Sequence, residues 1–128
     1  MLDTNIVSEL IRNPAGIVAG RIAEAGDAGM AVSIIVAAEL RFGGAKLGSA
    51  ALIRRIEAIL SGLLVIPFET PADAEYASIR SALERQGRSI GGNDLLIAAH
   101  ALAVGVPLVT RNIDEFSRVP GLRVVNWA

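Results

Sequence analysis

The fold is decided around one stretch, Ile90-Gly91-Gly92-Asn93-Asp94-Leu95-Leu96-Ile97-Ala98-Ala99-His100-Ala101-Leu102. Its glycine pair ends one segment, and Asn93 can cap the apolar helix that follows. Asp94 then stands at the first position of that helix, where acidic side chains meet free N–H groups and the positive end of the helix dipole. Capping alone explains Asp94, so a chemical role depends on what the other segments carry.

Short apolar runs alternate with helical patterns on either side of this stretch. Apolar spacing predicts helices over residues 4–11, 15–25, 34–42, 50–60, 70–86 and from 93 to about 104. Runs of β-forming residues predict strands over residues 29–33, 63–66, 108–110 and 122–126, and residues 1–3 can form a short first strand. The alternation predicts a single domain, residues 1–128, built as a three-layer α/β/α sandwich with a short-stranded, mainly parallel sheet.

Several helix ends carry their own sequence signals. Gly43-Gly44 is expected to stop the helix that begins at residue 34. Thr70 can cap the next long helix, with Pro71 at its first position and Asp73 completing a capping-box pattern. Gly105 follows the helix of the central stretch and is expected to end it.

The composition excludes several kinds of chemistry. The 128 residues include no cysteine, which excludes disulfides, thiol catalysis and cysteine-based zinc sites. The single histidine, His100, argues against a His-rich metal site or a His-dependent triad. The net charge of −1 does not indicate a strongly basic nucleic-acid binder, although eleven arginines against one lysine can still form a local phosphate-binding patch. No targeting signal is evident, and we expect a cytoplasmic protein. The mean hydropathy of +0.51 predicts that some apolar surface meets another chain.

Acidic residues follow or flank the predicted strands in four separate segments. Asp3 closes the first strand, Glu39 lies in the helix after the second, and Glu115 comes shortly after the 108–110 strand. Asp94 begins the helix that leads into that strand. Because ligands bind outside the carboxyl ends of parallel strands, all four can face one end of the sheet.

Each of these acids also has an ordinary structural explanation. Asp3 can cap the helix that begins at Thr4. Glu39, on an apolar helix face, can form an ion pair with Arg41 or another arginine. Asp114 and Glu115 lie in a polar loop, where solvated acids are common.

Three further features have structural explanations that we favour. His100 lies among alanines and leucines, where a hydrogen-bonded packing residue is more common than a catalyst. Trp127 is more typical of a packing or interface residue than of a base-stacking platform. Gly91-Gly92 is not a phosphate loop, because the chain has none of the glycine patterns that bind nucleoside triphosphates or dinucleotides.

Taken together, the acids favour an oxygen-ligand site for Mg²⁺ or Mn²⁺. Such a site suits phosphodiester hydrolysis, because hard cations held by carboxylates can activate a water and stabilise the leaving oxygen. Hydrolysis by this route leaves 5′-phosphate and 3′-hydroxyl ends.

The chain also resembles PIN-domain ribonucleases, specifically VapC-type toxins of toxin–antitoxin pairs. The resemblance covers essentially the whole chain and rests on the order and spacing of its motifs. These are Met1-Leu2-Asp3-Thr4-Asn5-Ile6, Ser33 through Glu39-Leu40-Arg41-Phe42-Gly43, the segment from Gln86 to Ala98, Val109-Thr110-Arg111-Asn112 with Glu115-Phe116, and Val119-Pro120-Gly121-Leu122 to Asn126-Trp127.

The resemblance implies a PIN-like fold and a set of metal-binding acids. Asp3, Glu39 and Asp94 match the first three positions. The fourth lies in the loop of residues 110–116, where relatives have an acid at the position of Asn112 or of Glu115; we assign it to Glu115. The remaining implied roles are supporting ones, for Asn5, Thr110 and Asn112.

The resemblance further implies Mg²⁺- or Mn²⁺-dependent endoribonuclease activity on structured RNA, often tRNA, with arrest of growth. It implies a homodimer and inhibition by a cognate VapB-like antitoxin, whose C-terminal segment would cover the acidic pocket. From charge and position, Arg12, Arg88 and Arg111 can hold the RNA backbone. The chain departs from the family pattern in a short N-terminus and in Gly92, where many relatives have proline.

Two other functions compete with this one. A non-catalytic module could use the acidic pocket only to bind an arginine-bearing partner peptide. A metal-dependent DNase on a similar fold is the second alternative, although the chain lacks room for DNA-clamping insertions.

Overall fold

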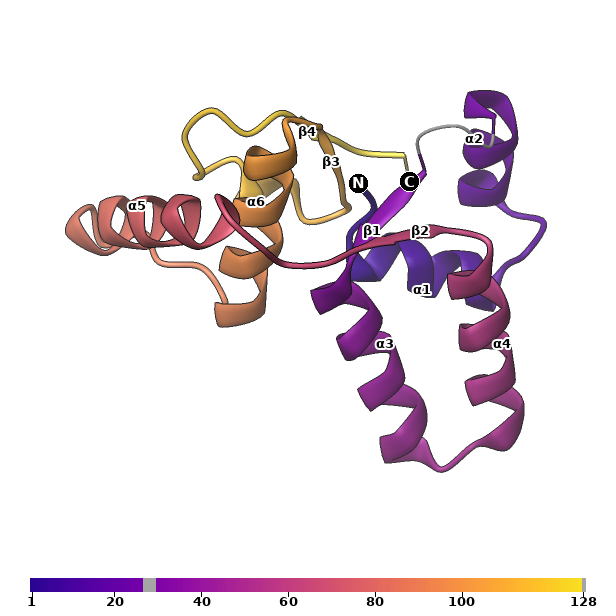
Figure 1. Ribbon diagram of the computed structural model, residues 1–128. Coiled ribbons are helices and arrows are strands. Elements are labelled where there is room, and N and C mark those ends of the chain that lie inside the picture. The colour runs from indigo at the N-terminus through magenta and orange to yellow at the C-terminus, as the bar shows by residue number, and fades with distance from the viewer. Residues whose placement is uncertain (27–29, 128) are drawn as a thin grey trace.

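The computed structural model describes residues 1–26 and 30–127 (Figure 1). Strands alternate with helices along the chain, as predicted. The elements in the described residues are α1 (Thr4–Arg12), α2 (Ile17–Ala25), β1 (Ala31–Ser33), α3 (Ile34–Leu47), α4 (Ala50–Ser61), β2 (Leu64–Ile66), α5 (Ala72–Arg85), α6 (Gly92–Val104), β3 (Leu108–Val109), α7 (Ile113–Phe116) and β4 (Val124–Val125). Residue 29 of the first predicted internal strand lies outside the described residues.

The strands pair in parallel around the N-terminal segment. β1 pairs with β2 and β3 pairs with β4, both in parallel. Leu2 joins the two pairs: it forms a parallel bridge to Val109, and its N–H donates to the carbonyl of Ala31 at 2.8 Å. The predicted mainly parallel, short-stranded sheet is confirmed, with residues 1–3 at its centre.

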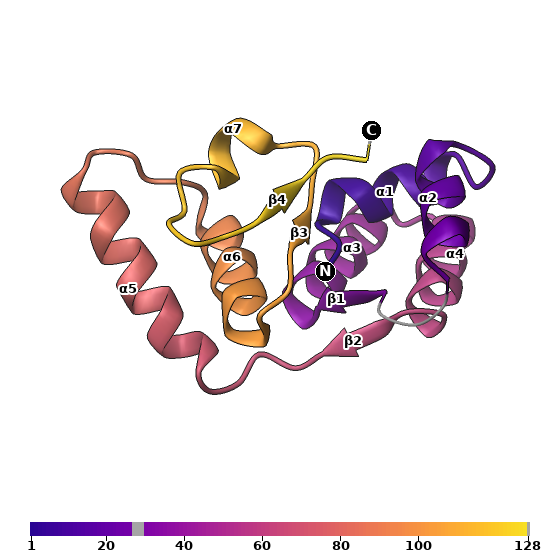
Figure 2. The same ribbon diagram turned by 90° about the horizontal axis from the view of Figure 1, so that it is seen from above.

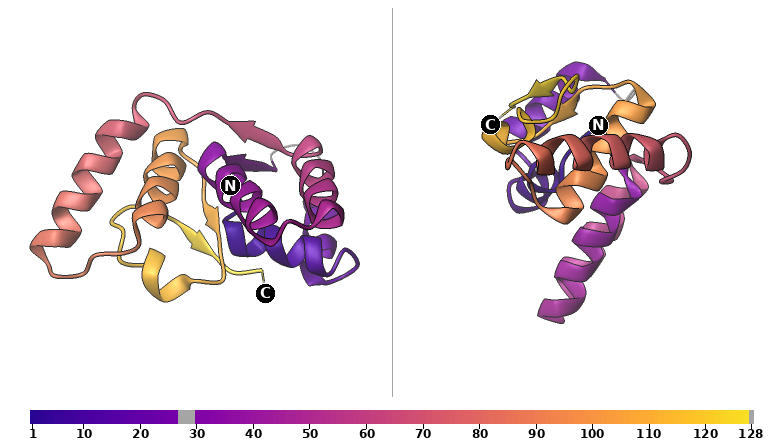
Figure 3. Two further views of the ribbon diagram at one scale, coloured as in Figure 1. Left: turned by 90° about the horizontal axis from the view of Figure 1, so that it is seen from below. Right: turned by 90° about the vertical axis from the view of Figure 1, so that its left-hand side faces the viewer.

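Helices gather at both ends of this strand arrangement. α5 and α6 pack together at one end, and α2 and α4 lie at the other, with the strands between them (Figures 1 and 2). The hairpin of α3 and α4 extends away from the strands (Figure 1), and α3 projects well beyond them when seen from the side (Figure 3). One apolar core connects these parts and includes the fully buried Ile6, Val32, Val36, Ile97 and Phe116.

α3 is longer than the sequence indicates, so the predicted stop at Gly43-Gly44 is wrong. The helix continues to Leu47 and ends at Gly48, whose φ of +62° is the left-handed conformation typical of a helix end. Gly44 lies inside α3 because α4 packs closely on it. A Cβ at this position would lie 3.0 Å from Ile56 Cδ1 and 3.1 Å from Ile53 Cγ1.

Two predicted caps are also wrong. α5 begins at Ala72, so Pro71 rather than Thr70 is its N-cap, and the N–H of Ala72 donates to the backbone carbonyl of Glu69 at 2.9 Å. α6 begins at Gly92 with Gly91 as N-cap, and none of the described side chains caps it. Asn93 therefore lies inside α6, where its side chain can contact another element. Gly105 ends α6 as predicted, with a φ of +80°.

No helix in the part of the chain that the structure describes is long and apolar enough to span a membrane.

Candidate active site

Asp3 is a buried carboxylate held by two hydrogen bonds. It caps α1, where its Oδ1 accepts the N–H of Thr4 at 2.8 Å, and its Oδ2 accepts the hydroxyl of Thr110 at 2.7 Å. Only 3% of the residue is exposed. Burial raises its pKa against the lowering effect of these hydrogen bonds, and Glu39 and Glu115 raise it further. The capping role and a place in an acidic site therefore coexist in one side chain.

Thr110 links Asp3 to the loop after β3. Its hydroxyl donates to Asp3 and accepts from Asn5 Nδ2 at 3.4 Å and from the backbone N–H of Asn112 at 3.0 Å. One donor and two acceptor positions are all that a hydroxyl has, so this buried group is fully used. The supporting positions predicted for Asn5 and Thr110 thus lie directly around Asp3.

Glu39 reaches toward Asp3 from the middle of α3. Its Oε1 accepts the hydroxyl of Thr4 at 2.6 Å, and its Oε2 accepts the side-chain N–H of Asn93 at 3.4 Å. Arg41, considered as an ion-pair partner of Glu39, instead binds Glu57 of α4 through two hydrogen bonds of 3.0 and 2.9 Å. Glu39 is therefore a half-buried carboxylate with neutral partners.

Asp94 and Glu115 form a pair at the N-terminus of α6. Glu115 Oε1 accepts the N–H of Gly91 at 2.8 Å, and its Oε2 accepts from Asn112 Nδ2. A Cβ on Gly91 would lie 3.4 Å from Asp94 Oδ2 and 3.6 Å from Glu115 Oε1, so both carboxylates flank this backbone.

The pKa values of Asp94 and Glu115 are shifted in opposite directions. Burial, followed by the hydrogen bond and charge of Glu115, raises the pKa of Asp94 to about 7, and Asp3 and Glu39 contribute to the rise. Burial also works to raise the pKa of Glu115, but hydrogen bonds from Gly91, Asp94 and Asn112 outweigh it and lower the pKa. The shifts are opposite because a protonated Asp94 can donate a hydrogen bond to an ionised Glu115.

The structure brings all four predicted acids into one electrostatic neighbourhood. Glu39 and Glu115 act on Asp3, and Asp3, Glu39 and Glu115 act on Asp94. Asp114, the other acid of the loop, is exposed. Asn112 donates a hydrogen bond to Glu115, so it supports that acid instead of replacing it at the candidate fourth position.

The donor set fits a hard divalent cation, because every side chain that converges here offers oxygen and the carboxylates repel one another. The carboxylates still lie apart: no group of three or more His, Cys, Asp or Glu side chains in residues 1–26 and 30–127 lies close enough to hold a metal ion. A cation would have to displace some of the hydrogen bonds that Glu39 and Glu115 make to neutral partners.

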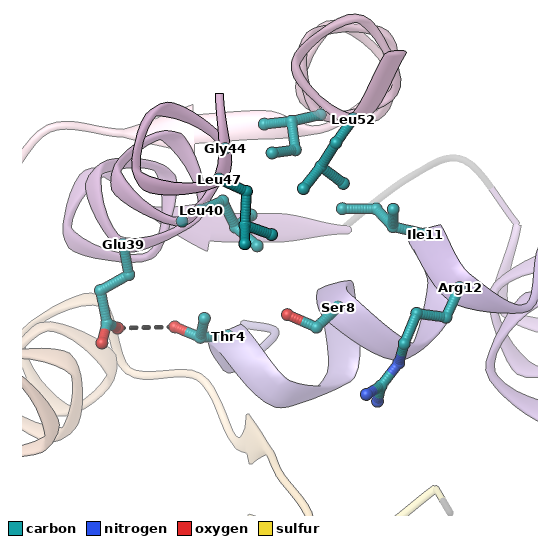
Figure 4. A pocket seen from close by; sticks show the side chains of 11 residues that line it. Thr4, Ser8, Ile11, Arg12, Glu39, Leu40, Gly44, Leu47 and Leu52 are labelled. Atoms are coloured by element: carbon teal, nitrogen blue, oxygen red, sulfur yellow. Dashed lines mark hydrogen bonds between the residues drawn. The ribbon is translucent and has the colours of Figure 1, made fainter. Parts of the chain in front are cut away.

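A cavity of about 380 Å³ opens beside Glu39, between α1, α3 and α4. Its wall is mostly apolar, with Glu39 and Thr4 near one end and Arg12 near the other (Figure 4). The apolar side chains that line it are Ile11, Leu40, Leu47, Leu52 and Ile56. No sequence pattern predicted this cavity, because the unexpected extension of α3 to Leu47 forms part of it.

The three arginines predicted to bind RNA do not form one cluster. Arg12 and Arg111 both contact Glu9, at 3.0 and 3.5 Å. Arg88 is an exposed residue of the connection between α5 and α6. Sequence reasoning missed Glu9, whose position one turn before Arg12 on α1 was the only available signal.

His100 and Trp127 have packing roles, as favoured from the sequence. The buried His100 lies 2.7 Å from the hydroxyl of Ser33 through Nδ1, and its ring packs edge-on against Phe68. Burial lowers the pKa of His100, as expected of a neutral core imidazole. Trp127 is half-buried against the core.

Comparison with known proteins identifies the family. The family model that describes the PIN domain matches residues 1–122. The chain belongs to the PIN-domain family. Ribonuclease VapC2 of Rickettsia felis is 40% identical to it over 129 residues, which cover 99% of this PIN domain and 96% of the relative. The tRNA(fMet)-specific endonuclease VapC of Salmonella typhimurium is 34% identical, with the same shares of the two chains covered.

A solved structure agrees with this PIN domain in fold. The crystal structure of VapBC2 from Rickettsia felis, bound to a DNA fragment from its promoter, matches with a TM-score of 0.91 and 38% identity. The match covers 100% of this chain and 98% of the other. The resemblance to VapC-type PIN domains and the PIN-like α/β/α fold predicted from the sequence are thus confirmed.

Proposed function

We propose that this PIN domain is a Mg²⁺- or Mn²⁺-dependent endoribonuclease, the toxin of a toxin–antitoxin pair. The observation that carries the proposal is the shared electrostatic neighbourhood of Asp3, Glu39, Asp94 and Glu115, in which burial and then the other three acids raise the pKa of Asp94 to about 7. Similarity to ribonucleases over nearly the full chain supports RNA as the substrate.

The four acids would hold the cation, which supplies charge neutralisation of the phosphate, activation of a water and stabilisation of the leaving oxygen when bound. The surrounding polar residues keep the acids in place. Thr110 fixes Asp3, Thr4 fixes Glu39, and Asn112 fixes Glu115. A cation that draws the carboxylates together would exchange some of these hydrogen bonds for its own contacts.

Asp94 must lose its proton before it can serve as a ligand. Because the pKa of this carboxyl is raised to about 7, cation affinity should rise as the pH increases through that value.

The RNA class that we propose is structured RNA such as tRNA. The supporting observation is the Salmonella typhimurium relative, named as a tRNA(fMet)-specific endonuclease. The site of action would be the cytoplasm, where this RNA is found.

The proposed partner is a VapB-like antitoxin, in keeping with the solved VapBC complexes to which this chain is similar. The apolar cavity beside Glu39 offers such a partner a place to bind next to the acids. Phe42 and Leu47 of α3 are 67% and 73% exposed, which supports contact with another chain, either the antitoxin or a second copy in a homodimer.

The test is cleavage of total cellular RNA by the purified, partner-free protein, with Mg²⁺ or with EDTA. Asp94→Asn is the inactive variant, and Asp73→Asn, an exposed acid on α5, is the matched charge control. We expect discrete fragments with 5′-phosphate ends from the wild type and Asp73→Asn in Mg²⁺ only. Cleavage in EDTA, 2′,3′-cyclic phosphate ends, or equal cleavage of single-stranded DNA would overturn the proposal.

A further inference from the structure

Glu9 lies between two arginines that come from different parts of the chain. Its Oε2 is 3.0 Å from Arg12 on the same helix and 3.5 Å from Arg111 in the loop after β3. All three side chains retain access to solvent, with exposed side-chain fractions of 65% for Arg12, 44% for Arg111 and 27% for Glu9. One carboxylate oxygen thus holds two guanidinium groups together at the surface.

The position of Arg111 is fixed by the same network that holds Asp3. The backbone N–H of Arg111 donates to Asn5 Oδ1 at 3.2 Å, and the amide of Asn5 also donates to Thr110. The loop that carries Arg111 is therefore tied to the first turn of α1, next to the acidic site.

α1 connects this arginine pair to the acids. Asp3 caps the helix at one end, and Arg12 is its last residue. At about 1.5 Å per residue, the two ends are roughly 13 Å apart, a distance that a few nucleotides of RNA span. In Figure 4 the guanidinium of Arg12 points away from the apolar side chains Ile11 and Leu52.

We propose that Arg12 and Arg111 form a binding site for an RNA backbone phosphate, and that Glu9 occupies this site until RNA displaces it. The inference rests on the proposed function and specifies how that site would hold its substrate. A carboxylate oxygen and a phosphate oxygen are the same kind of acceptor for guanidinium groups. Exposed ion pairs contribute little to stability, so exchange of Glu9 for phosphate costs little.

RNA fits this site better than an acidic protein segment does. The arginines lie one helix length from a cluster of carboxylates, which would repel an acidic peptide that extends toward them. A nucleic acid carries regularly spaced phosphates, so one phosphate can lie at the acids with their cation while another lies between the arginines.

The experiment measures binding of a fluorescently labelled RNA oligonucleotide in EDTA over a range of salt concentrations. Arg12→Gln and Arg111→Gln should each weaken binding roughly two- to fivefold and reduce the slope of log affinity against log salt by about 0.7. Glu9→Gln should strengthen binding by a similar factor, and Arg12→Gln in that background should remove the gain.

The pair Arg80 and Glu84 on α5 provides the matched control. These residues form a 3.0 Å surface ion pair. The helix that carries them, α5, lies on the other side of the strands from α1 (Figure 2). Arg80→Gln and Glu84→Gln make the same charge changes at a surface ion pair, in which Arg80 also donates to the hydroxyl of Tyr76 at 2.8 Å. We expect smaller changes in RNA affinity than at Glu9 and Arg12.

Equal effects at the two ion pairs would overturn the inference, because they would reflect net charge alone. A second result would also overturn it: the two arginine variants bind an acidic peptide more weakly, while their affinity for RNA is unchanged. That result would assign the arginines to a protein partner. Binding in EDTA does not require cleavage. The proposed function is tested separately, and it fails if the wild type shows no Mg²⁺-dependent cleavage.

Discussion

Asp94 makes the stability of the protein depend on pH in an unusual direction for an acid. An unfolded Asp titrates near pH 4, whereas the folded pKa is about 7. The folded state therefore binds more protons between these values. This contribution to stability is complete below about pH 4 and is lost as the pH rises through about 7.

We predict that, in EDTA, the Tm of the wild type falls by several degrees relative to Asp94→Asn between about pH 5 and about pH 8. The amide introduced by this substitution cannot ionise, so the variant should be the more stable protein at the higher pH. The lowered pKa of His100 acts in the opposite direction, but it is present in both proteins and leaves the difference unchanged. The lowered pKa of Glu115 acts below about pH 4.5, outside this window. A difference in Tm between the two proteins that stays constant across this pH range would contradict the prediction.

At the scale of single residues, the sequence located the acids but not their partners. Asp3, Glu39, Asp94 and Glu115 could be placed together because strand ends of a parallel sheet share one edge. Nothing in the spacing shows that Glu39 binds Thr4 instead of Arg41, since that choice depends on how α3 is oriented against α1 and α4. Chain order separates Arg111 from Glu9 by 102 positions, so their contact was equally hidden.

The packing of α3 on α4 depends on Gly44, a glycine inside a helix rather than in a turn. Gly43 and Gly44 are adjacent in α3, but only Gly44 faces α4; a Cβ at Gly43 would meet nothing within 4 Å. The two positions therefore form a matched pair for measuring this contact.

We predict opposite effects on the free energy of unfolding. Gly43→Ala should raise it by up to about 1 kcal/mol, because alanine favours the helix. Gly44→Leu should lower it by about 1 to 3 kcal/mol, because the added side chain has to displace Ile53 and Ile56. Urea denaturation measures both values. Destabilisation of similar size by both substitutions would show that the contact is not specific to Gly44.

At the scale of helices and strands, the sequence identified the elements better than their ends. Apolar periodicity depends on the local chain and predicted every long helix. A glycine pair can end a helix or allow a neighbouring helix to pack closely. For Gly44 the outcome depends on the packing of α4, which the local sequence does not show. The same limit applies to Asn93, which had the chemistry of a cap but points to Glu39 from within α6.

For the molecule as a whole, the mutual repulsion of the four acids predicts that a divalent cation stabilises the fold. Binding to the folded state alone adds about 2.7 kcal/mol at a concentration about a hundred times the Kd. We expect Mg²⁺ to raise the Tm of the wild type and of Asp73→Asn, and to raise that of Asp94→Asn much less. Calorimetry with and without EDTA measures this. An equal rise in all three proteins would indicate binding elsewhere.

The overall architecture was predictable because strands alternate with helices along the whole chain. The central position of residues 1–3 was not, since three residues carry too little periodicity to define a strand. Leu2 takes that position through backbone contacts to Ala31 on one side and Val109 on the other, which lie 29 and 107 residues away in the sequence.

The spread of the acids along the chain also affects how the protein can be made. The ribosome synthesises Asp3, Glu39 and Asp94 before Glu115. The strand β4, which pairs with β3, is synthesised after Glu115. A nascent chain can fold much of its N-terminal part during synthesis, but it lacks the last acid of the proposed site. A ribonuclease built in this order would gain its complete set of acids only after Glu115 has been synthesised.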